Sequence, residues 1–373
     1  MPEPTSIEIQ QFPLWDRLRE KRVPLSFDME ITARCNCDCR HCYIRLPAGD
    51  RIAKSRELTV KEIDDIAGQA VALGAVWCLI SGGEPFLRPD FEEIYLALKR
   101  RGLLVSVFTN ATLVRRAHIE LFKKYPPRDI EVTVYGVTRE TCERVTRVPG
   151  TFEKFIRGLN MLMDSGVRVR LKAMVIQSNL AEHDAIAEFC RDRTKDYFRF
   201  DPQLHLRFDR DVDRNAGIKA ERLTPEQIIA VEKADKQRMK AIKKECDTLI
   251  NQDLTRFKCN HLFHCGAGNG GFNVAYDGTF RLCSSLWAPG TTYDLRQGTL
   301  EDAWNNFVPQ VREMRSNRGE FLETCRVCPL VNLCLWCPAH AYLETGELDG
   351  PTPYFCAVAK ARAKVLREEE GGV

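Results

Sequence analysis

The sequence lacks the features that mark membrane, exported and nucleic-acid-binding proteins. No stretch approaches the ~20 consecutive apolar residues that a membrane-spanning helix needs. The first residues, Met1 to Phe12, are polar and contain no apolar signal core, so a cytoplasmic location is expected rather than export. Lys and Arg number 55 against 52 Asp and Glu. This near-neutral balance gives no reason to expect a nucleic acid partner.

Repeats and low-complexity segments are also missing, and 44% of the residues are hydrophobic, which is enough for a large core. Cysteine, in contrast, is abundant, with 16 residues. A disulfide scaffold is normally short and exported, so it does not fit this chain. In a reducing compartment, so many thiols indicate metal or iron–sulfur ligation. They gather in two clusters, Cys35–Cys42 and Cys259–Cys356, and only Cys78, Cys142, Cys190 and Cys246 are scattered between them.

Short β-branched runs alternate with amphipathic runs over residues 25–202, and the alternation predicts six β/α units. Helix signals lie between the runs, such as the capping-box pattern of Thr59 and Glu62. Such units form parallel strands with right-handed crossovers, and six are too few for a closed eight-stranded barrel. We therefore expect an open, partial TIM-like (β/α)6 barrel with its chemistry on the loops after the strands. The predicted strands are Leu25–Thr32, Val76–Ile80, Leu103–Phe108, Ile130–Tyr135, Val167–Ile176 and Tyr197–Asp201.

The rest of the chain has a different composition. Residues 1–24 form an N-terminal extension to the predicted barrel of residues 25–215. Residues 216–256 are highly charged and predict a helical connector, because Thr224-Pro225 is a helix-start signal. Residues 257–373 are rich in Gly and Cys and form a predicted third part. Within it, Asp277-Gly278 between two short strands predicts a hairpin.

The first cysteine cluster follows the first predicted strand, where this fold places its chemistry. Three thiolates spaced as Cys35-x3-Cys39-x2-Cys42 can hold three irons of a cubane cluster. The fourth iron then has no protein ligand, and an open position is what catalysis needs. The alternatives are a four-cysteine zinc site that includes Cys37, or a redox-active group of thiols.

These residues resemble the signature of the radical S-adenosylmethionine (SAM) superfamily, with Tyr43 as the aromatic residue beside the last cysteine. The resemblance continues at Ser81-Gly82-Gly83-Glu84-Pro85, after the second predicted strand. In the family this motif contacts the amino group of SAM, and glycines let the backbone approach closely. The resemblance also implies SAM contacts for Asn110, after the third strand, and for Thr133, on the fourth.

The resemblance implies a specific reaction. The unique iron chelates SAM, one electron cleaves the sulfonium C–S bond, and the resulting 5′-deoxyadenosyl radical takes a hydrogen atom from the substrate. The protein supplies binding, orientation and exclusion of water and oxygen. An electron donor such as flavodoxin or ferredoxin is an implied partner.

The second cysteine cluster contains eight thiols, which suit two four-ligand sites, and two zinc sites are the simple alternative. Its order resembles the SPASM domain, which binds two auxiliary 4Fe-4S clusters and would bring the total to three. The resemblance implies Cys259, Cys265, Cys283 and Cys337 for the first cluster, and Cys325, Cys328, Cys334 and Cys356 for the second. The chain departs from the family spacing once, because two residues instead of three separate Cys334 from Cys337.

SPASM enzymes act mostly on peptides and proteins, so the resemblance favours a maturase of ribosomally synthesised peptides that forms thioether or C–C crosslinks or epimerises residues. Only about 24 residues precede the first strand, fewer than a leader-binding domain of ~80 residues. Leader recognition would then use a separate leader-binding protein, which is a further possible partner, or a short strand, or the substrate would have no leader at all. A haem-pathway enzyme acting on a tetrapyrrole is one alternative. An anaerobic sulfatase-maturating enzyme is disfavoured, because Ser284 stands where that group has an Asp.

The loop after the sixth predicted strand should face the substrate. It carries His205 and three charged residues, Asp201, Arg207 and Asp209, and we hypothesise that Arg207 or Asp209 contacts the substrate. No residue is assigned as an acid or base. A protein of another class, a non-enzymatic iron–sulfur electron carrier or sensor, would share the cysteines but would not need SAM.

Overall fold

The fold was analysed in a computed structural model, which describes residues 17–18, 20–249, 259–334 and 336–370. Most of the predicted N-terminal extension and the end of the predicted connector lie outside the described residues. Six parallel strands follow one another in chain order across one sheet, as the alternating pattern predicts. They are β1 (Ser26–Thr32), β4 (Trp77–Gly82), β5 (Leu104–Thr109), β6 (Asp129–Thr133), β7 (Val169–Met174) and β8 (Arg199–Asp201).

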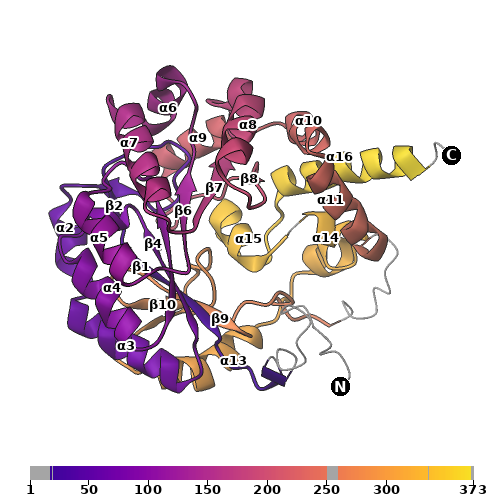
Figure 1. Ribbon diagram of the computed structural model, residues 1–373. Helices are drawn as coiled ribbons and strands as arrows, with labels where there is room; N and C mark the ends of the chain where they lie inside the picture. Colours follow the sequence, from indigo (N-terminus) through magenta and orange to yellow (C-terminus); the bar gives the residue numbers. More distant parts are fainter. Residues whose placement is uncertain (1–16, 19, 250–258, 335, 371–373) are drawn as a thin grey trace, which may run out of the picture.

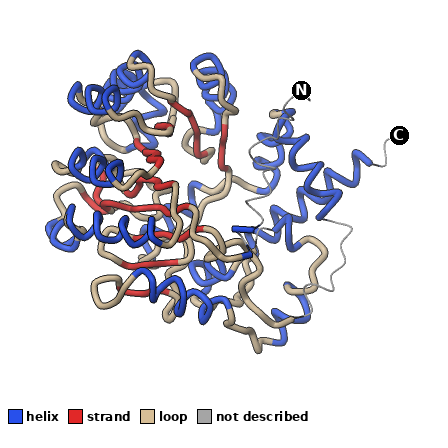
Figure 2. The backbone as a smooth tube through the Cα atoms, turned by 60° about the horizontal axis from the view of Figure 1, so that its bottom comes forward, coloured by secondary structure: helices blue, strands red, loops and turns tan. Residues whose placement is uncertain are grey.

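Helices cover the outer side of this sheet, and the strands lie inside them (Figures 1 and 2). Phe27 and Met29 on β1 pack against Ile63 and Ile94 of these helices, because alternate side chains of a strand point to opposite faces. The capping box of Thr59 and Glu62 begins one helix as predicted. The helices are α2 (Arg51–Arg56), α3 (Val60–Ala72), α4 (Phe91–Arg100), α5 (Arg116–Lys124), α6 (Arg139–Thr146), α7 (Thr151–Asp164) and α8 (His183–Arg193).

The predicted hairpin at Asp277-Gly278 is present and joins the barrel sheet. Strand β9 (Gly271–Val274) pairs antiparallel with β10 (Thr279–Arg281), which pairs with β11 (Thr292–Asp294). On its other side β9 pairs parallel with β1, so one sheet of nine strands runs through both parts of the chain. A two-stranded sheet of β2 (Arg34–Cys35) and β3 (Leu46–Pro47) supports the first cysteine loop.

Helices α10 (Pro225–Ala234), α11 (Lys236–Leu249), α14 (Val331–Cys334) and α16 (Pro353–Glu370) lie to one side of the barrel and form the right-hand part of Figure 1. Helices α14 and α16 pack against each other and against α10 and α11. Among the described residues, none of the helices has the length and apolar character to cross a bilayer. The other α-helices among the described residues are α9 (Val212–Glu221), α12 (Leu300–Asp302), α13 (Val308–Arg312) and α15 (Pro338–Thr345), of which α12 packs against α3.

Candidate active site at the carboxyl ends of the barrel strands

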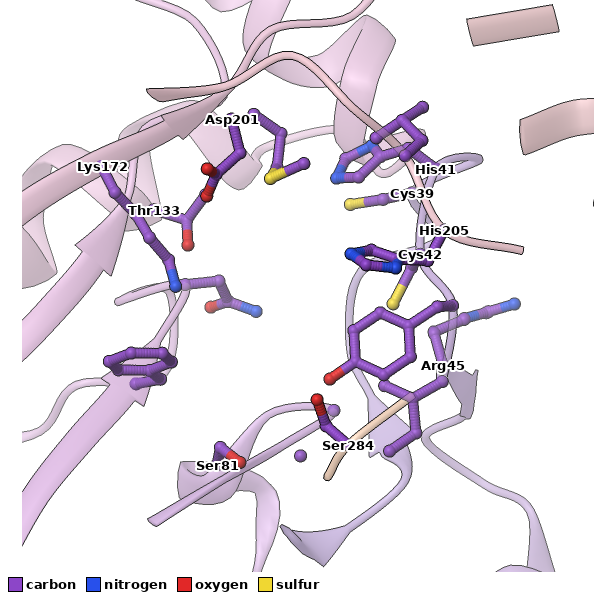
Figure 3. Close-up of a pocket in the computed structure, with 18 of the residues that line it drawn as sticks. Cys39, His41, Cys42, Arg45, Ser81, Thr133, Lys172, Asp201, His205 and Ser284 are labelled. Atoms are coloured by element: carbon purple, nitrogen blue, oxygen red, sulfur yellow. The ribbon is translucent and has the colours of Figure 1, made fainter. Parts of the chain in front are cut away.

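A cavity of about 560 Å³ opens at the carboxyl ends of the parallel strands and is lined by both parts of the chain. Lys172 and Thr133 form one wall, and Cys39 and Cys42 form the opposite wall (Figure 3). Ser284, from the segment after β10, closes a third side. The cavity is therefore large enough for a small cofactor and lies where a parallel β/α fold places its chemistry.

The four cysteines of the first cluster meet on one side of the cavity. Cys35, Cys37 and Cys39 are buried, and Cys42 is half-buried. The backbone N–H of Cys37 donates to the sulfur of Cys35 over 3.3 Å, and the side-chain amide of Asn110 lies 3.7 Å from the same sulfur. Burial raises the pKa of the Cys42 thiol, so a positively charged metal group that accepts thiolates would offset the cost of deprotonation.

Arg207 and Asp209 hold the loop that carries these cysteines. The guanidinium of Arg207 is buried, lies 2.6 Å from the Asp209 carboxylate, and donates to the carbonyl oxygens of Arg45 and Cys42 over 3.0 and 3.4 Å. Neither Arg207 nor Asp209 lines the cavity. Their placement therefore gives no support to the hypothesis that they contact the substrate, because their polar atoms are used to position the cysteine loop.

Gly82 and Gly83 are required by a close approach of two backbones. Gly82 has φ of +130°, and a Cβ atom there would lie 2.1 Å from the carbonyl oxygen of Thr32. A Cβ atom on Gly83 would lie 2.3 Å from the carbonyl oxygen of Arg34. The end of β4 therefore fits directly against the segment that leads into Cys35, and both glycines also line the cavity.

Glu84 is fully buried and does not line the cavity. Its carboxylate accepts hydrogen bonds from the Thr109 hydroxyl and the Asn110 backbone N–H, both over 2.8 Å. Burial raises the pKa of this carboxyl to about 7, and these hydrogen bonds oppose the shift. Glu84 thus fixes the loop that presents Asn110 to the cysteines, while the predicted contact of Glu84 with SAM remains a prediction.

The wall opposite the cysteines combines a cation, an aromatic ring and a hydroxyl. Lys172 on β7 lies beside Thr133 in the register of the sheet. Its ammonium group lies 2.7 Å from the Glu131 carboxylate and 3.7 Å from the centre of the Phe108 ring. Burial lowers the pKa of Lys172, and Glu131 opposes that shift. This wall can accept a ligand that has an apolar part and, in addition, either a carboxylate or a hydroxyl group.

Two carboxylates of β1 form the floor of the cavity. Glu30 is fully buried and lies 2.5 Å from the buried guanidinium of Arg281 on β10. Arg281 also donates to the carbonyl oxygen of Ser284 and lies over the Trp287 ring. Burial raises the pKa of the second carboxylate, Asp28, to about 6, and Arg281 opposes the shift. One guanidinium thus faces two carboxylates, so the floor has acidic character.

Two histidines from different parts of the chain meet beside the cysteines. His205 follows β8 and His340 lies on α15, and the centres of their rings are 4.1 Å apart. Burial lowers the pKa of His205, and it lowers the pKa of His340 to about 3. Both imidazoles are therefore neutral near pH 7, and in the described part of the chain the Nδ1 atom of each has no hydrogen-bond partner.

Seven of the eight cysteines of the second cluster form two groups. Cys265 and Cys283 lie close enough to Cys337 to add to the rise that burial causes in the pKa of the Cys337 thiol. The pKa of Cys334 is raised to about 12, chiefly by burial and also by Cys356, Cys325 and Cys328. Cys259 lies apart, 3.6 Å from the His264 imidazole. Over the described residues, no three His, Cys, Asp or Glu side chains are arranged around a point suited to one metal ion.

Most of the residues that the sequence singled out line the cavity: Tyr43, Gly82, Gly83, Asn110, Thr133, Asp201 and His205. Sequence reasoning missed Asp28, Glu30 and His340. The signal for the first two was the alternation of acidic and apolar residues in Phe27-Asp28-Met29-Glu30, which indicates an inner polar face. Cys78 and Cys190 are buried in the hydrophobic core, away from the cavity. The side chain of Cys246 lies outside the described residues.

Comparison with known proteins identifies the class. Residues 29–190 match the Radical SAM superfamily, and this part of the chain is a radical SAM domain. The chain is a radical SAM enzyme that resembles peptide maturases.

Three relatives illustrate the range of similarity. An AdoMet-dependent heme synthase of Methanosarcina barkeri is 25% identical over 89% of this chain and 96% of its own length. A PqqA peptide cyclase of Ruegeria pomeroyi is 24% identical over 83% of this chain and 81% of its own. The subtilosin biosynthesis protein AlbA of Bacillus subtilis is 29% identical over 46% of this chain, and the match spans only 37% of that relative.

The fold has counterparts among solved structures. SuiB of Streptococcus suis, bound to S-adenosylmethionine, superposes with a TM-score of 0.66 over 91% of this chain and 80% of SuiB, at 16% identity. At that identity the likeness shows the fold alone, a radical SAM barrel with further elements packed beside it.

Proposed function

We propose that this enzyme reductively cleaves SAM and takes a hydrogen atom from a peptide or small protein, and that it is a maturase of a ribosomally synthesised peptide. The observation that carries the proposal is the meeting of Cys35, Cys39 and Cys42 with the Gly82-Gly83 backbone around one cavity. The similarity to a PqqA peptide cyclase and to a subtilosin biosynthesis protein supports a peptide as the substrate. The modification made to the peptide is a thioether, a C–C crosslink or an inverted stereocentre, and which of these is made depends on the peptide.

We infer that the chain holds three 4Fe-4S clusters. The donor sets fit them: Cys35, Cys39 and Cys42 leave one iron open, and the later cysteines form two separate groups. Cys259 is the fourth ligand proposed for the first auxiliary cluster, together with Cys265, Cys283 and Cys337. Cys325, Cys328, Cys334 and Cys356 are the ligands proposed for the second.

When bound, the open cluster and SAM together supply a 5′-deoxyadenosyl radical. The protein's part is to bind, orient and enclose the reactants. The backbone at Gly82 and Gly83 would receive the ammonium group of SAM, Thr133 would contact its ribose, and Tyr43 and Asn110 would border it. The buried surroundings of the cavity would keep water and oxygen from the radical.

A second candidate substrate is a tetrapyrrole. The observation that favours it is the heme synthase relative, which this chain matches over 96% of the relative's length. Lys172, Arg199 and Arg238 line the cavity and could receive propionate carboxylates, whereas the acidic floor at Asp28 and Glu30 would repel them. A sulfatase-maturating activity is the weakest candidate, because Ser284 offers the cavity a hydroxyl instead of a carboxylate.

The test begins with the chain reconstituted under anaerobic conditions. Iron analysis should give about twelve irons per chain, the sum of three four-iron clusters. Addition of dithionite and SAM should release 5′-deoxyadenosine. An iron–sulfur carrier or sensor would release none, and that result would contradict the proposal.

Mass spectrometry then separates the substrates. Precursor peptides encoded near the gene should lose two hydrogens if they are crosslinked, or take up one solvent deuterium without other change if they are epimerised. If no peptide changes but a propionate-bearing tetrapyrrole loses mass as carbon dioxide, the second candidate replaces the first.

A further inference from the structure

We propose that the outer face of α11 is the docking surface for an acidic one-electron carrier protein. The inference rests on the proposed function, since each reductive cleavage of SAM consumes one electron that must come from another protein. It adds the place where that electron enters the molecule.

The surface is defined by Lys233, Lys236, Met239, Lys240 and Lys243, which line a shallow hollow. The four lysines are exposed. Lys236, Lys240 and Lys243 follow one another at helical spacing on α11, and Lys233 joins them from the end of α10. The hollow therefore presents a ring of ammonium groups around one apolar side chain.

The carboxylates that precede Lys233 and Lys236 in the sequence, Glu232 and Asp235, are used elsewhere. Glu232 is buried and accepts from Arg238 and Arg362 over 3.0 and 2.6 Å. Asp235 is buried and lies 3.1 Å from Arg191. In the described part of the chain, no ion pair involves Lys233, Lys236 or Lys240. Their charge is left uncompensated, although the whole chain has a net charge of only +3.

Beneath the hollow, α11 leads to Cys334 of α14. Ile242, together with Met239 at the base of the hollow, packs in the same hydrophobic cluster as Leu333 and Cys334 of α14. The two helices lie side by side on the right of Figure 1. Because a helix with its side chains is about 10 Å across, a protein docked on the lysines would be one helix away from Cys334.

A carrier protein suits this surface better than a permanent partner. Electron-transfer encounters use small, polar contacts, so that the carrier can leave after each electron. Clustered lysines attract an acidic partner and raise its rate of encounter, whereas they are depleted in the apolar cores of stable interfaces. An acidic segment of the substrate and a second copy of the chain are the other possible occupants, and the test distinguishes them.

The experiment measures the electron transfer directly. The full chain is reconstituted with its clusters and mixed with reduced flavodoxin, an acidic carrier, and the rate is read from the appearance of flavodoxin semiquinone. The unchanged chain and the two variants described next are also mixed with dithionite, a small reductant that needs no docking surface. The test variant carries Lys233→Glu, Lys236→Glu and Lys240→Glu. In the matched control, three exposed lysines on the barrel side are also changed to glutamate: Lys54→Glu, Lys61→Glu and Lys154→Glu.

The test variant should accept electrons from flavodoxin at least ~10-fold more slowly than the unchanged chain, the scale of electrostatic steering. Its reduction by dithionite should change less than twofold, and the control should be normal with both reductants. Raising the salt concentration should slow only the flavodoxin reaction, because salt screens exposed charges.

Equal flavodoxin rates in the test and control variants would overturn the proposal, and so would a change in oligomeric state or in peptide binding with the flavodoxin rate unaffected. If the charge reversal also slows reduction by dithionite, the helix is damaged. The neutral variant with three Lys→Gln changes and the salt dependence of the flavodoxin reaction then decide whether the proposal holds. The proposed function fails separately: a chain that takes electrons normally but releases no 5′-deoxyadenosine would contradict it while leaving the docking surface intact.

Discussion

Arg281 and Glu30 form an ion pair between two strands although the two residues are 251 positions apart in the sequence, with a distance of 2.5 Å from Nη2 to Oε2. Both side chains are fully buried. The pair joins β10 to β1 beneath the cavity, and Arg281 extends it to the segment after Cys283 through the carbonyl oxygen of Ser284. One contact thus connects the floor of the barrel with the cysteine-rich part.

Glu30→Gln should destabilise the fold strongly. The change leaves the buried Arg281 without its carboxylate, and removal of one partner of a buried ion pair costs about 3–5 kcal/mol. Urea unfolding of the cluster-free chain, followed by circular dichroism, measures this difference. The exposed Glu92→Gln is the matched control and should change the free energy of unfolding by less than about 0.5 kcal/mol. A Glu30→Gln variant as stable as this control would show that Arg281 is compensated by Asp28.

Asp28 should make the fold less stable as the pH rises from about 4 to about 6. Its folded pKa is raised from 3.8 to about 6, so the folded state holds the proton more tightly than the unfolded state. The stabilisation from the protonated form is complete below pH 4 and is lost by about pH 6. A shift of about two units corresponds to about 3 kcal/mol.

Asp28→Asn removes this dependence. Its stability relative to the unchanged chain should therefore increase by about 3 kcal/mol between pH 4 and pH 7 in the same unfolding assay. Asp192→Asn, at an exposed site, gives the background. A difference that stays constant with pH would mean that Asp28 does not titrate in this window.

Gly82→Ala and Gly83→Ala should each prevent assembly at the first cysteine cluster. A Cβ atom would lie 2.1 Å from the Thr32 oxygen or 2.3 Å from the Arg34 oxygen, so the segment before Cys35 must move. Reconstituted variants should lose about four of about twelve irons. Gly49→Ala, where no atom lies within 4 Å of the added Cβ, should keep them all. Full iron content in Gly82→Ala would show that the segment before Cys35 can move to accommodate the added Cβ atom.

Arg207→Lys should weaken the first cluster selectively, because lysine cannot bind the Asp209 carboxylate and two carbonyl oxygens at once. Loss of hydrogen bonds to a charged group, each worth about 1.5–3 kcal/mol, should release the loop of Cys42. The electron paramagnetic resonance signal of the SAM-binding cluster should lose intensity and its change on addition of SAM, while the auxiliary signals persist. The exposed Arg193→Lys is the control. If SAM still alters the signal of Arg207→Lys fully, Arg207 does not position the loop.

The sequence predicted the local features well, because their signals are local. Six strands, the capping box at Thr59 and the hairpin at Asp277-Gly278 are all present. The first strand was expected to begin one residue earlier, at Leu25, and the fifth and sixth strands are shorter than Val167–Ile176 and Tyr197–Asp201. Strand ends depend on which residues find partners in the neighbouring strand, which a single segment does not encode.

Contacts between distant segments could not be predicted. The parallel pairing of β9 with β1, the Glu30–Arg281 ion pair and the contact of His205 with His340 each join residues far apart in the chain. The same limit applies to Arg207, whose position after the sixth strand suggested a substrate contact. Its side chain points to the cysteine loop, because its N–H groups donate to two carbonyl oxygens of that loop and to the neighbouring Asp209 carboxylate.

The pairing of β9 with β1 also determines when the barrel can finish folding. Until residues 271–274 have left the ribosome, one edge of β1 offers unpaired N–H and C=O groups, which are prone to pair with other chains. Long-range parallel pairing is also slow to form, so the unpaired edge of β1 stays exposed for a large part of synthesis. A chain cut after β8 should aggregate, whereas the same piece produced together with residues from 259 onward should be rescued, because the second piece brings the missing strand.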